Sequence, residues 1–175
     1  MVNVSHQQIV LELVGQQELR ELEEWSLPEM QRRIHEWAIS KEWRGPNAET
    51  QRTTGDDIAL IVSEAAEALE AFRDCAEPTR IWWTYDVEVE GVKFKHCSEE
   101  QLKIIWNCDD LEEVEQMIED LGLIPKPQGV GPELADCLVR ILDYCEEHGI
   151  ALLEMMQMVM SHNETRPIRH GGKHL

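Results

Sequence analysis

The sequence predicts a mainly α-helical fold that carries a small inserted β-hairpin and an acidic helix. Long segments place apolar residues at helical spacing, whereas the stretch RIWWTYDVEVEGVKFKHC alternates β-forming residues around Glu90-Gly91. Between Asp109 and Asp120 there are seven acids and no base. With 175 residues and no low-complexity linker, we expect one helical domain over residues 1–175, with an insert at about 73–130.

The composition restricts the function. Against 35 acids there are only 16 bases, and the net charge of −19 argues against a nucleic-acid-binding face, which would need clustered lysine and arginine. The N-terminal residues do not follow the pattern of a signal peptide, and no apolar run approaches membrane-spanning length. We therefore expect a cytoplasmic protein with no membrane partner. The five cysteines are odd in number and form no CxxC pair, which favours reduced thiols.

An amphipathic helix is expected to begin at about Leu27. Residues 7–24 also have a helical pattern, but a weaker one. After them, one helical face carries four apolar residues, with Pro28 in the first turn and Gly45 beyond the end; the four are Met30, Ile34, Trp37 and Ala38.

The remaining elements follow in order. A second helix is expected from about Asp57 to Arg73, capped by Thr54 or Asp56. The hairpin comes next, and then two short helices in residues 98–107 and 109–122. Residues 124–132 are expected to form a loop, followed by a long helix that is closed by Gly149 and a last helix at about 150–162.

Carboxylates interrupt the apolar faces of two of these helices. On a helical wheel Glu64 falls between apolar residues, and Glu67 lies beside it at i+3. In the long helix apolar residues surround most of the circumference, so we expect a buried element with one narrow polar stripe. The stripe consists of Glu133, Asp136, Arg140 and Asp143.

Four carboxylates in one partly buried place would repel one another unless cations neutralised them. Oxygen ligands alone favour Mg²⁺, with Mn²⁺ also possible, over zinc. Two alternatives compete with a magnesium site. The glutamates could simply be solvated, or they could belong to a di-iron bundle; the latter is disfavoured because no histidine has an acid three positions before it.

Three stretches together resemble the MazG-like all-α nucleoside triphosphate pyrophosphohydrolases, whose hallmark is ExxE followed by ExxD. They are SEAAEALEAF, GPELADCLVRILDYCEEHGIAL and NETRPIRHGGK. The resemblance covers about residues 27–72 and 129–173. It implies a helical bundle that assembles as a homodimer or homotetramer, and hydrolysis of a nucleoside triphosphate to the monophosphate and pyrophosphate. Mg²⁺ would be held by four carboxylates, Glu64, Glu67, Glu133 and Asp136.

The resemblance also implies roles for individual residues. Glu64 and Glu67 would be catalytic, with Glu67 accepting a proton from water. Trp43 is the better candidate for holding the base and Trp37 the second, since Trp37 is expected in the core. Four residues of the C-terminal segment would contact the phosphates: Asn163, Arg166, Arg169 and Lys173. The chain departs from the family in its longer middle segment and in Val159, where family members often carry lysine.

A different class of function stays open. The chain could be a non-catalytic acidic helical module that binds a nucleotide or a protein without hydrolysing anything. A related enzyme, phosphoribosyl-ATP pyrophosphohydrolase, shares the helical chemistry and would differ in substrate.

Overall fold

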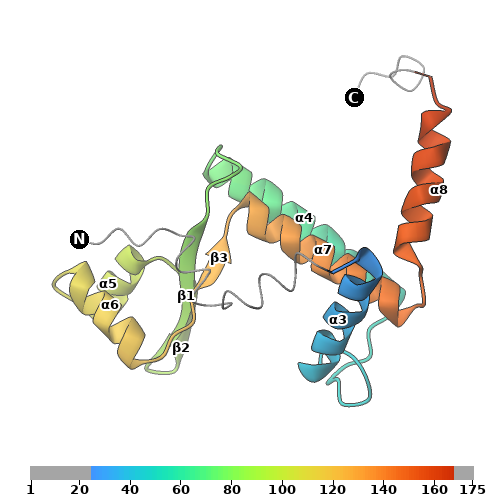
Figure 1. Cartoon of the computed structure of the whole chain (residues 1–175). Coiled ribbons are helices and arrows are strands. Elements are labelled where there is room, and N and C mark those ends of the chain that lie inside the picture. The colour runs from blue at the N-terminus through green and yellow to red at the C-terminus, as the bar shows by residue number, and fades with distance from the viewer. Residues whose placement is uncertain (1–24, 168–175) are drawn as a thin grey trace. The chain divides into compact units, whose positions relative to one another are not determined.

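The computed structural model describes residues 25–167, in which six helices and a three-stranded antiparallel sheet follow one another (Figure 1). The fold is mainly helical, as predicted. The chain divides into two compact units, Met1–Ile61 with Leu138–Leu175, and Val62–Cys137. Helices α4, Thr54–Asp74, and α7, Val130–Glu147, each contribute residues to both units. None of the helices in the described range has the length and apolar character to cross a bilayer.

In the first unit, helix α3 (Leu27–Ser40) begins with Pro28 in its first turn, as expected. Its buried residues are Gln31 and Ala38, while Trp37 is 43% exposed. The prediction that Trp37 belongs to the core is therefore wrong. The buried face is rotated toward Gln31, because the amide of that side chain finds hydrogen-bond partners inside the unit.

Helix α4 begins before the predicted Asp57. The Thr53 hydroxyl oxygen accepts a hydrogen bond from the Asp56 backbone N–H at 3.2 Å, and Asp56 Oδ2 accepts in return from the Thr53 backbone N–H at 2.8 Å. This reciprocal arrangement satisfies donors at the helix start. The cap is thus Thr53, and the predicted caps Thr54 and Asp56 lie inside the helix.

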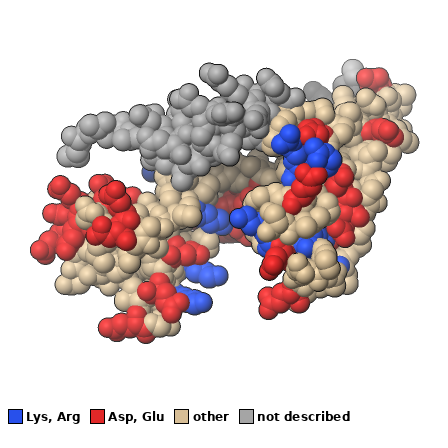
Figure 2. All heavy atoms as spheres, turned by 60° about the horizontal axis from the view of Figure 1, so that its bottom comes forward, with Lys and Arg blue, Asp and Glu red and all other residues tan. Residues whose placement is uncertain are grey.

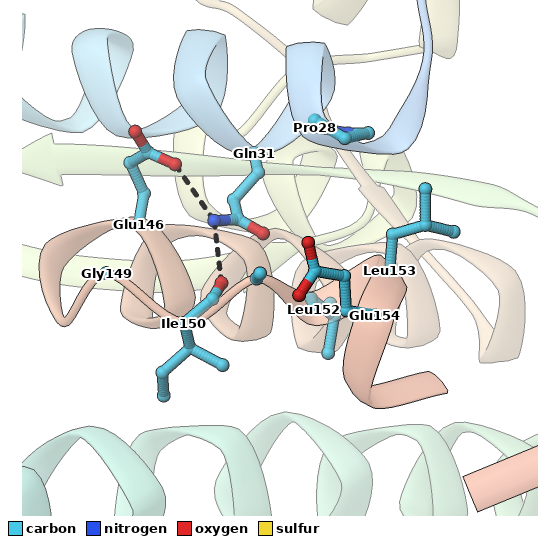
Figure 3. Close-up of a pocket in the computed structure, with 9 residues that line it drawn as sticks. Pro28, Gln31, Glu146, Gly149, Ile150, Leu152, Leu153 and Glu154 are labelled. Carbon is cyan, nitrogen blue, oxygen red and sulfur yellow. Dashed lines mark hydrogen bonds between the residues drawn. The ribbon is translucent and has the colours of Figure 1, made fainter. Parts of the chain in front are cut away.

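Helix α8 (Leu152–Glu164) follows the turn at Gly149, whose φ is +63°. The Gln31 side-chain amide donates to Glu146 Oε2 at 2.9 Å and to the Ile150 carbonyl oxygen at 3.0 Å (Figure 3). These bonds join α3 to the chain between α7 and α8. Helix α8 contacts α3, yet none of its own residues is buried.

In the second unit, strands β1 (Trp82–Val89) and β2 (Val92–Cys97) form the predicted hairpin. Its turn is Glu90-Gly91, with φ of +52° and +79° at the two residues. Two positive φ angles in a two-residue turn match the right-handed twist of the strands.

A third strand, β3 (Lys126–Gln128), pairs antiparallel with the start of β1. The sequence predicted a loop here. Three residues containing a proline have no recognisable alternation, and Pro127 is tolerated because β3 is an edge strand in the order β2-β1-β3.

The two predicted short helices are α5 (Glu99–Trp106) and α6 (Leu111–Asp120), and they pack beside the hairpin. A capping box of Ser98 and Gln101 starts α5, and Asp110 caps α6. Five buried residues form the core of this unit, namely Tyr85, Val87, Cys97, Leu102 and Val114. Carboxylates gather on the solvent side of α5 and α6 (Figure 2, left), so the acidic run is a solvated helix face.

The long helix α7 differs from its prediction. Leu134 and Leu138 are 53% and 48% exposed, whereas Glu133 is buried at 3%. Two members of the polar stripe, Glu133 and Asp143, are therefore buried together with Leu142 and Cys145, while Asp136 is exposed. Helix α4 also buries a carboxylate and exposes an apolar side chain: Glu64 is buried, and Val62 is 61% exposed.

Candidate metal centre

Three carboxylates of the second unit converge. One oxygen each of Glu64 on α4 and of Glu133 and Asp136 on α7 lie within 4.8 Å of one another. Glu64 and Glu133 are buried and Asp136 is exposed. The structure thus brings together three of the four residues that the sequence predicted as metal ligands.

The local structure explains this convergence. Glu133 lies in the first turn of α7, where the unpaired N–H groups of a helix favour negative charge. Asp136 follows one turn later on the same face. Glu64 is buried together with Ala68 and Ala71, which follow it on α4.

Glu133 is held in an environment that disfavours its charge. Burial raises the pKa of its carboxyl group, the Lys126 ammonium opposes that rise, and the charges of Glu67, Asp136 and Glu64 raise the pKa further. Glu133 Oε2 is buried without a hydrogen-bond partner among the described residues. A buried oxygen of this kind needs a cation or a donor to compensate for its lost hydration.

Glu67 occupies a different position from Glu64. It is exposed, and it does not belong to the group of three close carboxylates found among the described residues. Its charge nevertheless acts on Glu133. Glu67 is therefore near the group and open to solvent.

The donor set fits a hard divalent cation. All three candidate ligands are carboxylates, which suit Mg²⁺ or Mn²⁺, and three protein oxygens leave further positions for water or phosphate oxygens. The orphaned Glu133 Oε2 supplies an observation independent of the grouping itself. The residues present are thus compatible with the ion that the sequence predicted.

A second charged cluster, which we call the Arg44 clasp, lies in the first unit. Arg44 donates two hydrogen bonds to Asp57, at 2.8 and 2.9 Å, and one to Asp143 at 2.8 Å. His35 Nδ1 lies 2.9 Å from the other Asp143 oxygen. The stripe residue Asp143 therefore has a structural partner, which sequence spacing could not reveal because Arg44 is 99 residues away.

The remaining predicted site residues belong to the first unit or fall outside the described range. The rings of Trp37 and Trp43 form an edge-to-face pair with centroids 4.8 Å apart, and both are about half exposed. Asn163 and Arg166 are exposed near the end of α8 and lie in hydrogen-bond contact at 3.3 Å. Arg169 and Lys173 lie outside the described residues.

A cavity of about 370 Å³ lies beside the Gln31 side chain and its hydrogen bonds to Glu146 and Ile150 (Figure 3). Its polar lining includes the carboxylates of Glu146 and Glu154 and contains no lysine or arginine. An anionic phosphate group would be repelled there. This cavity does not suit the predicted triphosphate.

Comparison with known proteins yields no match, whether to a family model, a curated protein or a solved structure.

Proposed function

We propose that the chain is a Mg²⁺-dependent nucleoside triphosphate pyrophosphohydrolase of the MazG-like all-α kind, converting a (d)NTP and water to the (d)NMP and pyrophosphate. The observation that carries the proposal is the convergence of Glu64, Glu133 and Asp136 on two helices, with two of the three buried. Packing two buried carboxylates together is unfavourable unless positive charge or hydrogen-bond donors compensate, and a divalent cation is one such compensation. The type of reaction is inferred from the resemblance of the surrounding sequence to this family.

Each residue of the candidate centre has a chemical role in this proposal. Glu64, Glu133 and Asp136 would hold the cation. Mg²⁺, when bound there, supplies positive charge for the phosphates and lowers the pKa of a coordinated water. Glu67, exposed beside the group, accepts the proton of the attacking water. The water oxygen would form a bond to the α-phosphorus, the bond from the α-phosphorus to the oxygen that bridges it to the β-phosphate would break, and pyrophosphate would leave.

The base would be held by the pair Trp43 and Trp37. Their half-exposed rings offer apolar surface for stacking. Asn163 and Arg166, with Arg169 and Lys173, stay candidates for contacts with phosphate.

A second copy of the chain is the proposed partner. Helix α8 has no buried residue, and an isolated helix of 13 residues is marginally stable in water. Its exposed apolar side chains, and those facing outward from α4 and α7, would be covered in a homodimer or homotetramer. On α8 these are Leu153, Met155, Met156, Met158, Val159 and Met160.

The test of the reaction is pyrophosphate release from a panel of NTPs, dNTPs and phosphoribosyl-ATP, with Mg²⁺, Mn²⁺ or EDTA. Glu64→Gln should abolish metal-dependent release while the protein stays folded. Glu70→Gln is the matched control, because Glu70 lies exposed on the same helix and should leave turnover unchanged. Nucleotide binding without release by the wild type would favour the non-catalytic binding module.

The test of assembly is sedimentation equilibrium over a range of protein concentrations. Wild-type protein should be at least dimeric, and Val159→Glu should shift it toward the monomer. A monomeric wild type at high concentration would reject the second copy as the partner.

A further inference from the structure

The cavity beside the Gln31 side chain, which we call the Gln31 cavity, lies entirely within the first compact unit. Its walls come from the first turns of α3, the end of α7, the turn that follows α7, and the start of α8. Its volume of about 370 Å³ falls at the lower end of the range for cavities that hold small molecules. The space is therefore large enough for a small ligand.

The Gln31 side chain presents a hydrogen-bond acceptor to this cavity. Its amide nitrogen faces two acceptors, Glu146 Oε2 and the Ile150 carbonyl oxygen, which fixes the amide oxygen on the opposite side (Figure 3). Gln31 is only 7% exposed, and its Oε1 accepts no hydrogen bond from the described residues. This oxygen is not one of their fully enclosed unpaired atoms, so a ligand in the cavity can reach it.

Two carboxylates add negative charge to the same cavity. Glu146 comes from α7 and is partly buried, and Glu154 comes from the first turn of α8. Neither forms an ion pair with a base of the described residues, and the lining contains no lysine or arginine. Ala151 gives α8 no side-chain cap, so the N–H groups of its first turn add roughly half a positive charge. Two full negative charges outweigh it, and the cavity attracts cations.

The apolar part of the lining identifies the class of cation. Pro28, Leu152 and Leu153 line the cavity together with the carboxylates, and Leu153 is 41% exposed. An ammonium group has three donors and no acceptor, which suits two carboxylates and an amide oxygen. A carbon chain attached to it would cover the leucines. A metal ion would leave these leucines uncovered, and no group of three close metal-ligating side chains occurs here among the described residues.

We propose that the Gln31 cavity binds a small organic amine. The ammonium group contacts Glu146, Glu154 and the Gln31 amide oxygen, and the carbon chain lies against Leu152 and Leu153. The site is separate from the candidate metal centre, whose carboxylates belong to the other unit, and the inference does not depend on the proposed function. Because the ligand contacts α3, α7 and α8 at once, it would hold α8, which has no buried residue of its own, against α3.

The experiment measures binding to the full chain by calorimetry at low ionic strength. The probes are hexylammonium, 1-hexanol, which lacks the charge, and ammonium ion, which lacks the chain. Hexylammonium should bind saturably with a Kd of about 1 mM or tighter. Each of the other two probes should bind about tenfold more weakly or worse, because each makes only half of the contacts. High salt should weaken hexylammonium binding, since the attraction is electrostatic.

Variants locate the bound amine. Glu154→Gln keeps the shape and removes one charge, and it should weaken hexylammonium binding about fivefold or more. Glu146→Gln should act alike, and its side-chain oxygen can still accept from Gln31. Glu164→Gln is the matched control: it removes an exposed charge from the other end of α8 and should change binding by less than about twofold. Leu153→Ala should weaken hexylammonium binding about threefold and leave ammonium binding unchanged. Circular dichroism checks that each variant is folded.

The outcomes decide the inference without any measurement of turnover. Hexylammonium binding that is weakened in Glu154→Gln and retained in Glu164→Gln supports it. Equal binding by these two variants would show attraction to the net charge alone and would overturn the site. It is also overturned if 1-hexanol binds as tightly as hexylammonium, if Mg²⁺ displaces the amine at equal concentration, or if no saturable binding occurs up to about 10 mM. Amine binding and pyrophosphate release therefore succeed or fail separately.

Discussion

Glu133→Gln should stabilise the metal-free protein. Glu133 is 3% exposed, its Oε2 has no partner among the described residues, and oxygens of Glu64 and Asp136 lie within 4.8 Å. Glutamine has the same shape, carries no charge, and can donate its amide hydrogens to the neighbouring carboxylates. The substitution therefore relieves repulsion without opening a cavity.

The magnitude follows from one buried, unsatisfied charged group. Relieving it is worth about 1–2 kcal/mol in the free energy of unfolding at neutral pH. For a chain of this size that raises Tm by about 2–8 °C. Because the folded pKa of Glu133 lies above the unfolded one, the stability from its protonation is fully present below the unfolded pKa and is lost as pH rises through the folded pKa. The difference in the free energy of unfolding between Glu133→Gln and wild type should thus become smaller as pH falls toward about 4, close to the pKa of an ordinary glutamate.

In Mg²⁺ the wild type should become more stable than Glu133→Gln. An ion that binds only the folded state adds about 1.4 kcal/mol to the free energy of unfolding for each tenfold increase in its concentration above Kd. Wild-type Tm should rise steadily across a Mg²⁺ titration, whereas Glu133→Gln, which lacks one ligand charge, should respond weakly. Thermal unfolding followed by circular dichroism, in EDTA and in increasing Mg²⁺, measures both effects.

The matched control is Glu119→Gln, which removes one exposed charge from α6 and should follow the wild type in both buffers. The reasoning is refuted if Glu133→Gln unfolds at a lower temperature than wild type in EDTA. An unreduced response to Mg²⁺ in that variant would exclude Glu133 as a ligand.

Three further predictions concern the scaffold, each measured by urea unfolding followed through tryptophan fluorescence. Arg44→Met should lose about 3–5 kcal/mol, since it leaves Asp57 and Asp143 buried without their cation; a loss below 1 kcal/mol would mean that the clasp is solvated. Leu102→Ala, at a fully buried position of α5, should cost about 2–5 kcal/mol, and a neutral effect would contradict the assigned core. Gly129→Ala should cost about 1–3 kcal/mol or more, because φ is +132° and the new Cβ would lie 2.5 Å from a carbonyl oxygen; wild-type stability would argue against the position of β3.

Helices and the hairpin could be predicted from the sequence because their signals are local. Helical spacing predicted α3 to α8 to within a few residues, and Glu90-Gly91 marked the hairpin turn. Strand β3 gave no such signal, since three residues can be recognised as a strand only by their pairing partner in β1. The cap of α4 was placed within a few residues of the true one, Thr53.

In the candidate site, too, some features could be predicted from local spacing and others could not. Spacing of i, i+3 suggested that Glu64 and Glu67 would both point inward, but only Glu64 is buried, because the packed stripe of α4 passes through Ala68 and Ala71. Periodicity alone could not decide which positions of α7 are buried, because apolar residues surround most of the helix; the buried set contains Glu133 and Asp143 as well as Leu142 and Cys145.

By itself the sequence determined a mainly helical chain with an inserted hairpin, an acidic helix and two acidic motifs embedded in apolar segments. Only the tertiary structure decided that Glu64, Glu133 and Asp136 meet and that Arg44 pairs with Asp143. The physical reason is distance along the chain. Helix and turn preferences act between residues a few positions apart, whereas burial, repulsion and pairing of charges depend on segments that become neighbours only after folding.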